Sequence, residues 1–168
     1  MKGNFTVKEA YDLKVEKEQE GNQHLWKQIW KKKWWPKVAQ FLWLTCKGRI
    51  LTWDQIQRRG MQGPARCELC KMENENIEHL LNSCQFARRQ WDAICEAFGR
   101  TVRNPQSIKE TVQQWGHGHF VSPVLNRAWE LAVGFTLWMI WNERNRRIFK
   151  NETLTLEKVW GRIIEHIR

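Results

Sequence analysis

The sequence predicts a compact, mainly α-helical domain. In most segments the apolar residues recur every three or four positions, the spacing of one buried helix face, and residues that start or stop helices flank these segments. Runs in which apolar and polar residues alternate, as in a half-buried strand, are scarce. The length of 168 residues and the apolar fraction of 42% suffice for one core of ordinary size.

The N-terminal part of the chain is predicted to hold three helices. Thr6 and Glu9 form the T-x-x-E pattern of a capping box, which opens a helix over residues 6–19. A short helix is expected over residues 25–30, where apolar residues lie at helical spacing. Pro36 suits the first turn of the next helix, because proline lacks the amide hydrogen that this turn leaves unpaired.

Two further helices flank a cysteine-rich segment. Thr52 is a favourable cap for a helix that ends at Gly60, since glycine readily adopts the left-handed conformation of a helix stop. After the cysteines, a helix is expected from Ala87 to Phe98, with the stop residue Gly99 behind it.

The C-terminal part is predicted to contain a helical turn or two within residues 107–115 and then two helices. Ser122 and Pro123 begin the longest helix, which continues to about Phe149. Its middle is apolar on nearly all sides, so other helices must enclose it. A last helix is expected over residues 155–167.

Four residues have the spacing C-x2-C-x8-H-x4-C, namely Cys67, Cys70, His79 and Cys84. Three thiolates and one imidazole complete a closed tetrahedron, which is typical of a structural zinc site. The spacing therefore predicts one Zn²⁺ in a CCHC zinc knuckle over residues 66–91, inserted between helices. Because no coordination position stays open for water, catalysis by the metal is not expected.

The other cysteines and the start of the chain bear on the compartment. Cys46 and Cys95 lie among apolar helix positions and are predicted to be small core residues. The first residues lack the apolar stretch of a secretion signal, and the longest uncharged apolar run, residues 131–141, is too short to cross a bilayer. We therefore expect a reducing compartment, nuclear or cytosolic, and no membrane partner.

The charge of the chain predicts a polyanionic partner, RNA or DNA. Lysine and arginine number 28 against 18 acidic residues, which gives a formal net charge of +10, and such a field attracts nucleic acids. Three basic clusters are candidate contacts, and tryptophans within or beside two of them could stack on unpaired bases. These candidates are Lys31, Lys32, Lys33, Trp34 and Trp35; Arg58 and Arg59, with Arg49, Arg66 and Trp53 near them; and Arg144, Arg146, Arg147 and Lys150.

Two alternatives remain open for these residues. A single charge run is often only a solvated face, and the arginines of the last cluster could instead pair with Glu143, Glu152 or Glu157 and hold the last helix. Other tryptophans are predicted to fill the core rather than to stack on bases. These are Trp26, Trp30, Trp43, Trp129, Trp138 and Trp141.

Short pieces in a fixed order also give the chain a family resemblance. They are FTVKEAYD at residues 5–12, WKQIW at 26–30, PKV and FLWL within 36–44, RILT at 49–52, and the segment from Cys67 to Trp91. In this order they resemble the zinc-binding region downstream of the reverse transcriptases of plant non-LTR retrotransposons. WMIWNERNRRIFK at residues 138–150 resembles the segment that follows in the same polyproteins.

The resemblance implies a zinc-binding module over residues 1–98, with a C-terminal helical region, residues 99–168, packed on it. It also implies a grip on RNA or DNA during reverse transcription. The chain shows neither the aspartate pair of a polymerase nor the acidic set of a ribonuclease H, and we expect an expressed fragment or an element remnant recruited as a host gene.

The function expected from the sequence is therefore a zinc-stabilised, non-catalytic module that binds RNA or single-stranded DNA. The sequence offers no paired nucleophile and base, no glycine-rich phosphate loop and no acid pair, so neither an enzyme nor a small-molecule substrate is expected. The alternative is a protein–protein adaptor, a recruited retrotransposon fragment that docks a partner through a tryptophan-rich helical surface.

Overall fold

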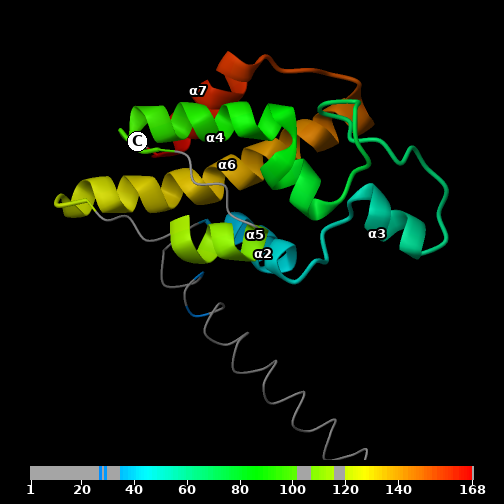
Figure 1. The fold of residues 1–168 in the computed structure, drawn as a ribbon, viewed down its shortest axis with the longest axis horizontal. Helices are drawn as coiled ribbons and strands as arrows, with labels where there is room; N and C mark the ends of the chain where they lie inside the picture. Colours follow the sequence, from blue (N-terminus) through cyan, green and yellow to red (C-terminus); the bar gives the residue numbers. More distant parts are fainter. Residues whose placement is uncertain (1–26, 28, 30–34, 102–106, 116–119, 168) are drawn as a thin grey trace, which may run out of the picture.

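The computed structural model describes residues 27, 29, 35–101, 107–115 and 120–167, and it is mainly helical as predicted (Figure 1). The expected helix over residues 6–19, most of the short helix over 25–30, and Lys31 to Trp34 lie outside these described residues. In the described part, an isolated antiparallel bridge joins Arg66 and Asn74.

The helices follow one another in the predicted order. They are α2 (Pro36–Cys46), α3 (Trp53–Arg58), the π-helical turn η1 (His79–Ser83), α4 (Gln85–Ala97), α5 (Ile108–Glu110), the π-helical turn η2 (Thr111–Trp115), α6 (Pro123–Lys150) and α7 (Leu156–Ile167).

Most helix boundaries fall close to the predicted start and stop residues, while α4 begins at Gln85, two residues before the predicted Ala87. Pro36 is the first residue of α2, and Ser122 caps α6 by accepting a hydrogen bond from the Leu125 amide at 3.4 Å. Gly60 and Gly99 follow α3 and α4 with φ of 80° and 62°, the left-handed conformation that favours glycine. Thr52 occupies the N-cap position of α3 as predicted, but its side chain makes no capping hydrogen bond and donates to Asp54 Oδ1 instead.

Helix α6 is the centre of the fold. It contacts α2, α4, α7, η1 and η2, and in Figure 1 it runs between α4 and α7 on one side and α2 and α5 on the other. This arrangement confirms the expectation that an all-round apolar helix must be enclosed. The buried apolar residues of its middle are Trp129, Ala132, Val133, Phe135, Leu137, Met139 and Ile140.

The tryptophans that the structure describes mostly pack with the core. Trp129 is buried and lies edge-on to Phe98, with ring centroids 5.2 Å apart. Trp138 and Trp141 flank Phe41 of α2, with centroids 5.2 and 6.1 Å from its ring. These aromatic contacts join α6 to α2 and to the end of α4. Trp43 is also packed against the core, while Trp26 and Trp30 lie outside the described residues.

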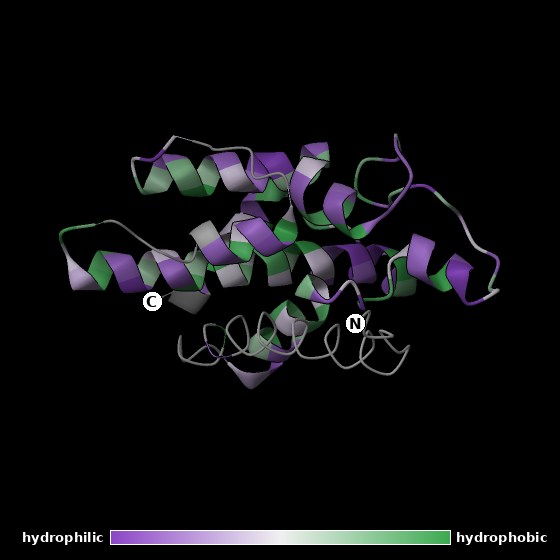
Figure 2. Cartoon of the chain, turned by 60° about the horizontal axis from the view of Figure 1, so that its bottom comes forward, coloured by the Kyte–Doolittle hydropathy of each residue, from purple (hydrophilic) through white to green (hydrophobic). Residues whose placement is uncertain are grey.

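Helix α3 lies at the edge of the molecule, away from the enclosed middle of α6 (Figure 1). Figure 2 shows it as mostly hydrophilic, and none of its residues is buried. No helix within the described ranges is long and apolar enough to cross a membrane. The division of the chain between residues 98 and 99 stays a prediction.

Candidate metal centre

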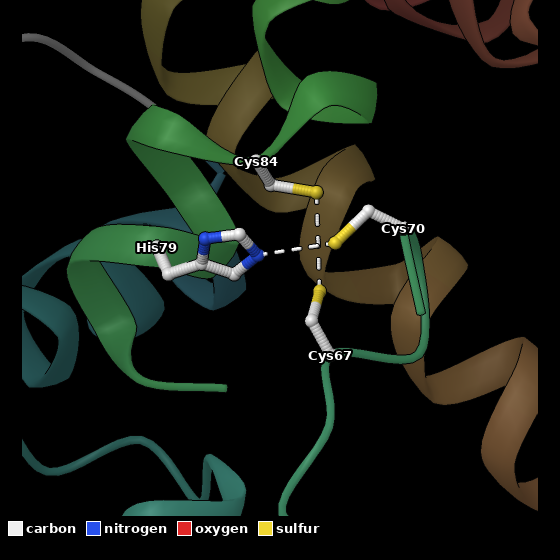
Figure 3. A group of neighbouring side chains, drawn as sticks. All are labelled: Cys67, Cys70, His79 and Cys84. Carbon is white, nitrogen blue, oxygen red and sulfur yellow. Dashed lines mark hydrogen bonds between the residues drawn. The ribbon is translucent and has the colours of Figure 1, made fainter. Parts of the chain in front are cut away.

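The fold brings the four predicted metal ligands together. Cys67 and Cys70 come from a loop, and His79 and Cys84 come from the two ends of the η1 segment (Figure 3). Their ligand atoms all lie within 4.8 Å of one another. The Cys67 and Cys84 sulfurs are 3.8 Å apart, and Cys70 Sγ is 3.2 Å from His79 Nε2.

These distances suit a tetrahedral zinc ion. Zinc–sulfur bonds of about 2.3 Å and zinc–nitrogen bonds of about 2.0–2.1 Å give tetrahedral edges of roughly 3.8 Å between two sulfurs and 3.6 Å between sulfur and nitrogen. The observed sulfur–sulfur edge equals this value, and the sulfur–nitrogen edge is somewhat shorter. The donor set and its geometry therefore fit Zn²⁺.

A tight loop presents the first two cysteines. The Cys67 amide donates to the Glu73 carbonyl at 2.7 Å, and the Cys67 carbonyl accepts from the Lys71 amide at 2.8 Å. Lys71 has φ of 60°, a left-handed conformation that reverses the chain directly after Cys70. These backbone bonds close the knuckle and direct both sulfurs to the same point.

A π-helical turn presents the other two ligands. The Cys84 amide donates to the His79 carbonyl at 2.7 Å, a bond over five residues instead of the four of an α-helix. Asn76 Oδ1 accepts a hydrogen bond from the His79 amide at 2.8 Å and so holds the start of the turn. The wider turn places His79 and Cys84 on one side, facing the knuckle (Figure 3).

The site is enclosed, and its histidine is oriented. Cys67 and Cys84 are 0% exposed and His79 is 4% exposed. His79 Nδ1 lies 3.3 Å from Glu73 Oε2 and 3.4 Å from Ser83 Oγ. A proton on Nδ1, held by these oxygens, leaves the Nε2 lone pair for the metal, as carboxylate–histidine–zinc arrangements do.

The sulfurs of Cys67 and Cys84 share a hydrogen bond. A hydrogen bond from the Cys67 thiol to the Cys84 sulfur lowers the pKa of Cys84, and the same bond, together with burial, raises the pKa of Cys67. One proton thus sits between two sulfurs, where zinc would replace it, because metal binding to thiols releases protons.

A buried ion pair fastens the knuckle to α6. The Arg144 guanidinium donates to Glu75 Oε1 from Nη2 at 2.6 Å and from Nε at 3.2 Å, and the two side chains are 2% and 0% exposed. The same oxygen accepts from the Trp53 amide at 2.9 Å. Arg144 also lies over the rings of Trp53 and Trp141, 5.5 and 5.0 Å from their centroids.

A second set of contacts joins α6 to the knuckle and to the start of α7. Arg147 donates from Nη1 to the Leu69 carbonyl at 3.1 Å and from Nε to Glu143 Oε1 at 2.8 Å. Glu143 Oε1 also accepts from the Leu154 amide at 3.0 Å. Helix α6 is therefore fixed to both neighbours by charged side chains that lie inside the molecule.

These contacts correct the prediction for the last basic cluster. Arg144 is buried against Glu75 and cannot reach a phosphate in this fold, and the Arg147 side chain is 15% exposed and occupied by Glu143 and Leu69. Arg146 is partly exposed and pairs with Glu152 at 2.9 Å. The alternative of pairing with glutamates thus describes these arginines better, although the main partner of Arg144 is Glu75. Lys150 is exposed.

Of the other two basic clusters, the structure describes the one around α3 but only Trp35 of the one at residues 31–35. Lys31, Lys32, Lys33 and Trp34 lie outside the described residues, and Trp35 is 56% exposed, with its ring edge-on to Phe135 at 5.5 Å. Arg58 and Arg59 are exposed, as are the neighbouring Arg49 and Arg66.

Trp53 is covered on its ring and is a poor stacking surface. A Cβ added to Gly63 would lie 2.3 Å from the Trp53 ring, and the Arg144 guanidinium occupies a place over the same ring system. The suggestion that this tryptophan stacks on a base is therefore corrected. A side chain at position 63 would therefore require the Trp53 ring to shift.

The two remaining cysteines lie away from the metal ligands. Cys95 is buried and Cys46 packs against the core, as predicted. Burial raises the pKa of Cys46 to about 12 and that of Cys95 to about 11, so neither is a reactive thiolate at neutral pH.

The roles of the glutamates around the knuckle were not predicted from the sequence. Glu73 orients His79, Glu75 pairs with Arg144, and Glu78 accepts from the Ile108 amide at 2.9 Å. The available signal was three acidic residues inside a metal-binding segment, which is where carboxylates that support metal ligands occur.

Comparisons with known proteins agree with the metal centre. Residues 5–91 match the family model described as zinc-binding in reverse transcriptase. Over 161 residues the chain is 23% identical to a protein of Arabidopsis thaliana that carries the provisional name of a ribonuclease H protein. The alignment covers 94% of this chain but 25% of that relative, so the chain spans about a quarter of its length. No solved structure is significantly similar to the chain.

The family match covers more than half of the chain and includes all four ligands of the cluster. The Cys₃His cluster has the donor set of a structural zinc site. This protein therefore belongs to the family of zinc-binding domains of reverse transcriptases.

Proposed function

We propose that this protein is a non-catalytic module that binds single-stranded RNA or DNA and is stabilised by zinc. One observation carries the proposal. Four arginines on and around α3 are exposed, in contrast to Arg144 and Arg147, which are held in ion pairs inside the molecule. We name these four the α3 basic face. They are Arg49, Arg58, Arg59 and Arg66.

The arrangement of this face supports contact with phosphate. The Arg58 side chain is 73% exposed, and its nearest carboxylate, on Asp54, is 3.9 Å away, which leaves the guanidinium largely available. Glu75 links the residue before Arg66 to the start of α3. Its amide donates to the Ala65 carbonyl at 2.7 Å, and its carboxylate and carbonyl accept from the Trp53 and Asp54 amides. Exposed arginines on a backbone held by such hydrogen bonds suit the phosphate contacts that position a nucleic acid.

The metal centre supports a structural role for zinc. Its four ligands are all protein side chains, and two of the three sulfurs are fully enclosed, so no open position offers itself to a substrate. The two cysteines outside the site have raised pKa values and are not poised as nucleophiles. We further propose a nuclear or cytosolic location, where the thiols stay reduced.

The proposal is tested by the salt dependence of binding. Zinc-loaded protein is titrated against a labelled single-stranded oligonucleotide at several salt concentrations. Each phosphate contact contributes about −0.7 to the log–log slope on single strands, so Arg58→Gln with Arg59→Gln should flatten the slope by roughly 1.4. Arg88→Gln with Arg89→Gln is the matched control, because it removes another exposed arginine pair, from α4.

Three outcomes separate the possibilities. A slope that flattens for the α3 pair alone supports the α3 basic face as the contact. Equal flattening for both pairs indicates diffuse attraction, and binding that is weak and independent of salt contradicts the proposal. In that last case the protein–protein adaptor becomes the better reading, with the exposed Trp35 as the first residue to test.

A further inference from the structure

A pocket between α6 and α7 has the composition of a nucleotide site. Its volume is about 290 Å³. Helix α6 contributes Arg146, Phe149 and Lys150 to its lining, and α7 contributes Arg162. The pocket thus combines two members of the last basic cluster, Arg146 and Lys150, with Arg162, which lies 12 or more positions further along the chain.

The carboxylates that pair with Arg146 are either exposed or shared. Arg146 pairs with Glu152, whose side chain is 59% exposed, at 2.9 Å. The second carboxylate near Arg146, on Glu143, is 3.9 Å away and is already shared with Arg147. An exposed acidic side chain is a weak competitor, so a phosphate could replace Glu152 on Arg146.

An exposed aromatic ring completes the pocket. Phe149, next to Lys150, is 76% exposed, although phenylalanine side chains are usually buried. Its place beside three cations is the combination with which proteins bind single strands: cations follow the phosphates, and a base stacks on the ring. A base inside a duplex stacks on its neighbours and cannot offer the same face.

A smaller chamber that shares lining residues with the pocket contains a buried carboxylate oxygen without a hydrogen bond to any described residue. A smaller chamber of about 10 Å³ shares Arg146 and Arg162 with the pocket and is also lined by Glu143. Glu143 Oε2 is buried and has no hydrogen-bond partner within the described part of the chain. A chamber of this size has room for about one water molecule.

From these observations we propose that the α6–α7 pocket binds one unpaired nucleotide of a single strand. The phosphate lies among Arg146, Lys150 and Arg162, and the base stacks on Phe149. The volume lies just below the range of roughly 300–1,000 Å³ usual for ligand sites, which suits one nucleotide rather than a longer ligand. This inference rests on the proposed function and adds a second contact to the α3 basic face.

The test compares a single strand with a blunt-ended duplex of the same length, using zinc-loaded protein of all 168 residues. Phe149→Ala should weaken binding of the single strand about tenfold and leave the duplex nearly unchanged, while Phe149→Trp should retain binding. Glu152→Gln should tighten single-strand binding, because it frees Arg146 for phosphate. Zinc content and thermal unfolding of each variant show that the fold is intact.

A second measurement does not depend on variants. A single strand that contains 4-thiothymidine is photo-crosslinked to the unaltered protein, and the attached peptides are identified. Crosslinks within residues 146–162 support the pocket. Binding without crosslinks there, or with full affinity in Phe149→Ala, overturns the pocket and leaves the proposed function standing. An unaltered protein that binds no oligonucleotide overturns both.

Discussion

The zinc-binding segment and the helices around α6 reach a stable structure by different means. The segment over residues 65–84, here the zinc lobe, gathers its ligands in a loop and one π-helical turn, and several glutamates and a lysine surround them. The middle of α6 instead buries a continuous set of apolar side chains against α2, α4 and α7. Metal binding therefore adds to apolar burial in the first region, where Leu69, Ile77, Leu80 and Leu81 belong to the common core, and removal of apolar surface from water alone organises the second.

The contrast is sharpest where the two regions meet. Arg144 and Arg147 extend the apolar middle of α6 with two charged side chains, and both of them contact the zinc lobe, through Glu75 and the Leu69 carbonyl. An ion pair that is removed from water gains little net stability, but it costs several kcal/mol when one partner is lost. The junction thus fixes how the lobe sits on the helices more than it adds to the total stability.

Loss of the metal should have the largest effect and should be confined to one region. Cys70→Ser should abolish stoichiometric zinc binding, because one of four ligands is lost and apparent binding energies of such sites are about 10–16 kcal/mol. Hydrogen exchange should then increase across the zinc lobe and remain slow in the middle of α6. Metal analysis and exchange mass spectrometry measure both.

The matched controls for this change are the cysteines outside the cluster. Cys46→Ala and Cys95→Ala should each retain one zinc per chain, since neither thiol belongs to the four-residue cluster. Full zinc content in Cys70→Ser would refute the ligand assignment. Uniform loss of protection along the whole chain would refute the separation of the two regions.

Breaking the junction should have the next largest effect. Arg144→Met leaves the buried Glu75 carboxylate without its charged partner, so the free energy of unfolding should fall by about 3–5 kcal/mol. The double variant with Glu75→Gln should recover part of this loss, because no buried charge remains and the amide can still accept from Trp53. Chemical denaturation of the zinc-loaded protein gives these values.

The junction prediction also addresses the role of the last basic cluster. Because Arg144 is 2% exposed, its replacement should leave the salt dependence of nucleic-acid binding unchanged once the protein is folded. A loss below about 1 kcal/mol combined with a flatter slope would instead indicate a surface arginine that contacts phosphate.

The smallest predicted effect concerns the orientation of one ligand. Glu73→Gln removes the carboxylate charge near His79 Nδ1, and such supporting changes weaken zinc binding by about 10–100-fold. Because the Glu73 side chain is 70% exposed, we expect the lower end of this range. Competition with a chelator measures the affinity. Glu68→Gln in the same knuckle is the control, since Glu68 pairs with Lys71, and an equal loss in both variants would contradict the role of Glu73.

The elements predicted well are those whose causes are local. Ser122, Pro123 and Gly99 set helix ends through caps and backbone conformation, so neighbouring residues suffice to place them. The apolar sides of α6 likewise reveal that it must be enclosed, because that requirement depends only on its own composition. Which helices enclose it is a property of the packed molecule.

The candidate contacts were harder to predict because exposure is a property of the whole fold. Arg144, Arg146 and Arg147 look alike in sequence, yet the first is buried, the second lines a pocket and the third supports the zinc lobe. Arg162 joins that pocket from a different helix, and no local pattern indicates this.

The sequence by itself determined the metal ligands, the helical class and most helix ends. All of these depend on residues close together along the chain: a chelating set spans 18 positions from Cys67 to Cys84, and a cap acts within one turn. Only the tertiary structure decided which charged side chains are buried in ion pairs and which are exposed to solvent. Arg144 pairs with Glu75 across 69 positions, and burial of that pair depends on the packing of the zinc lobe against α6. A charge is a nucleic-acid contact or a structural partner according to what surrounds it, and packing alone supplies those surroundings.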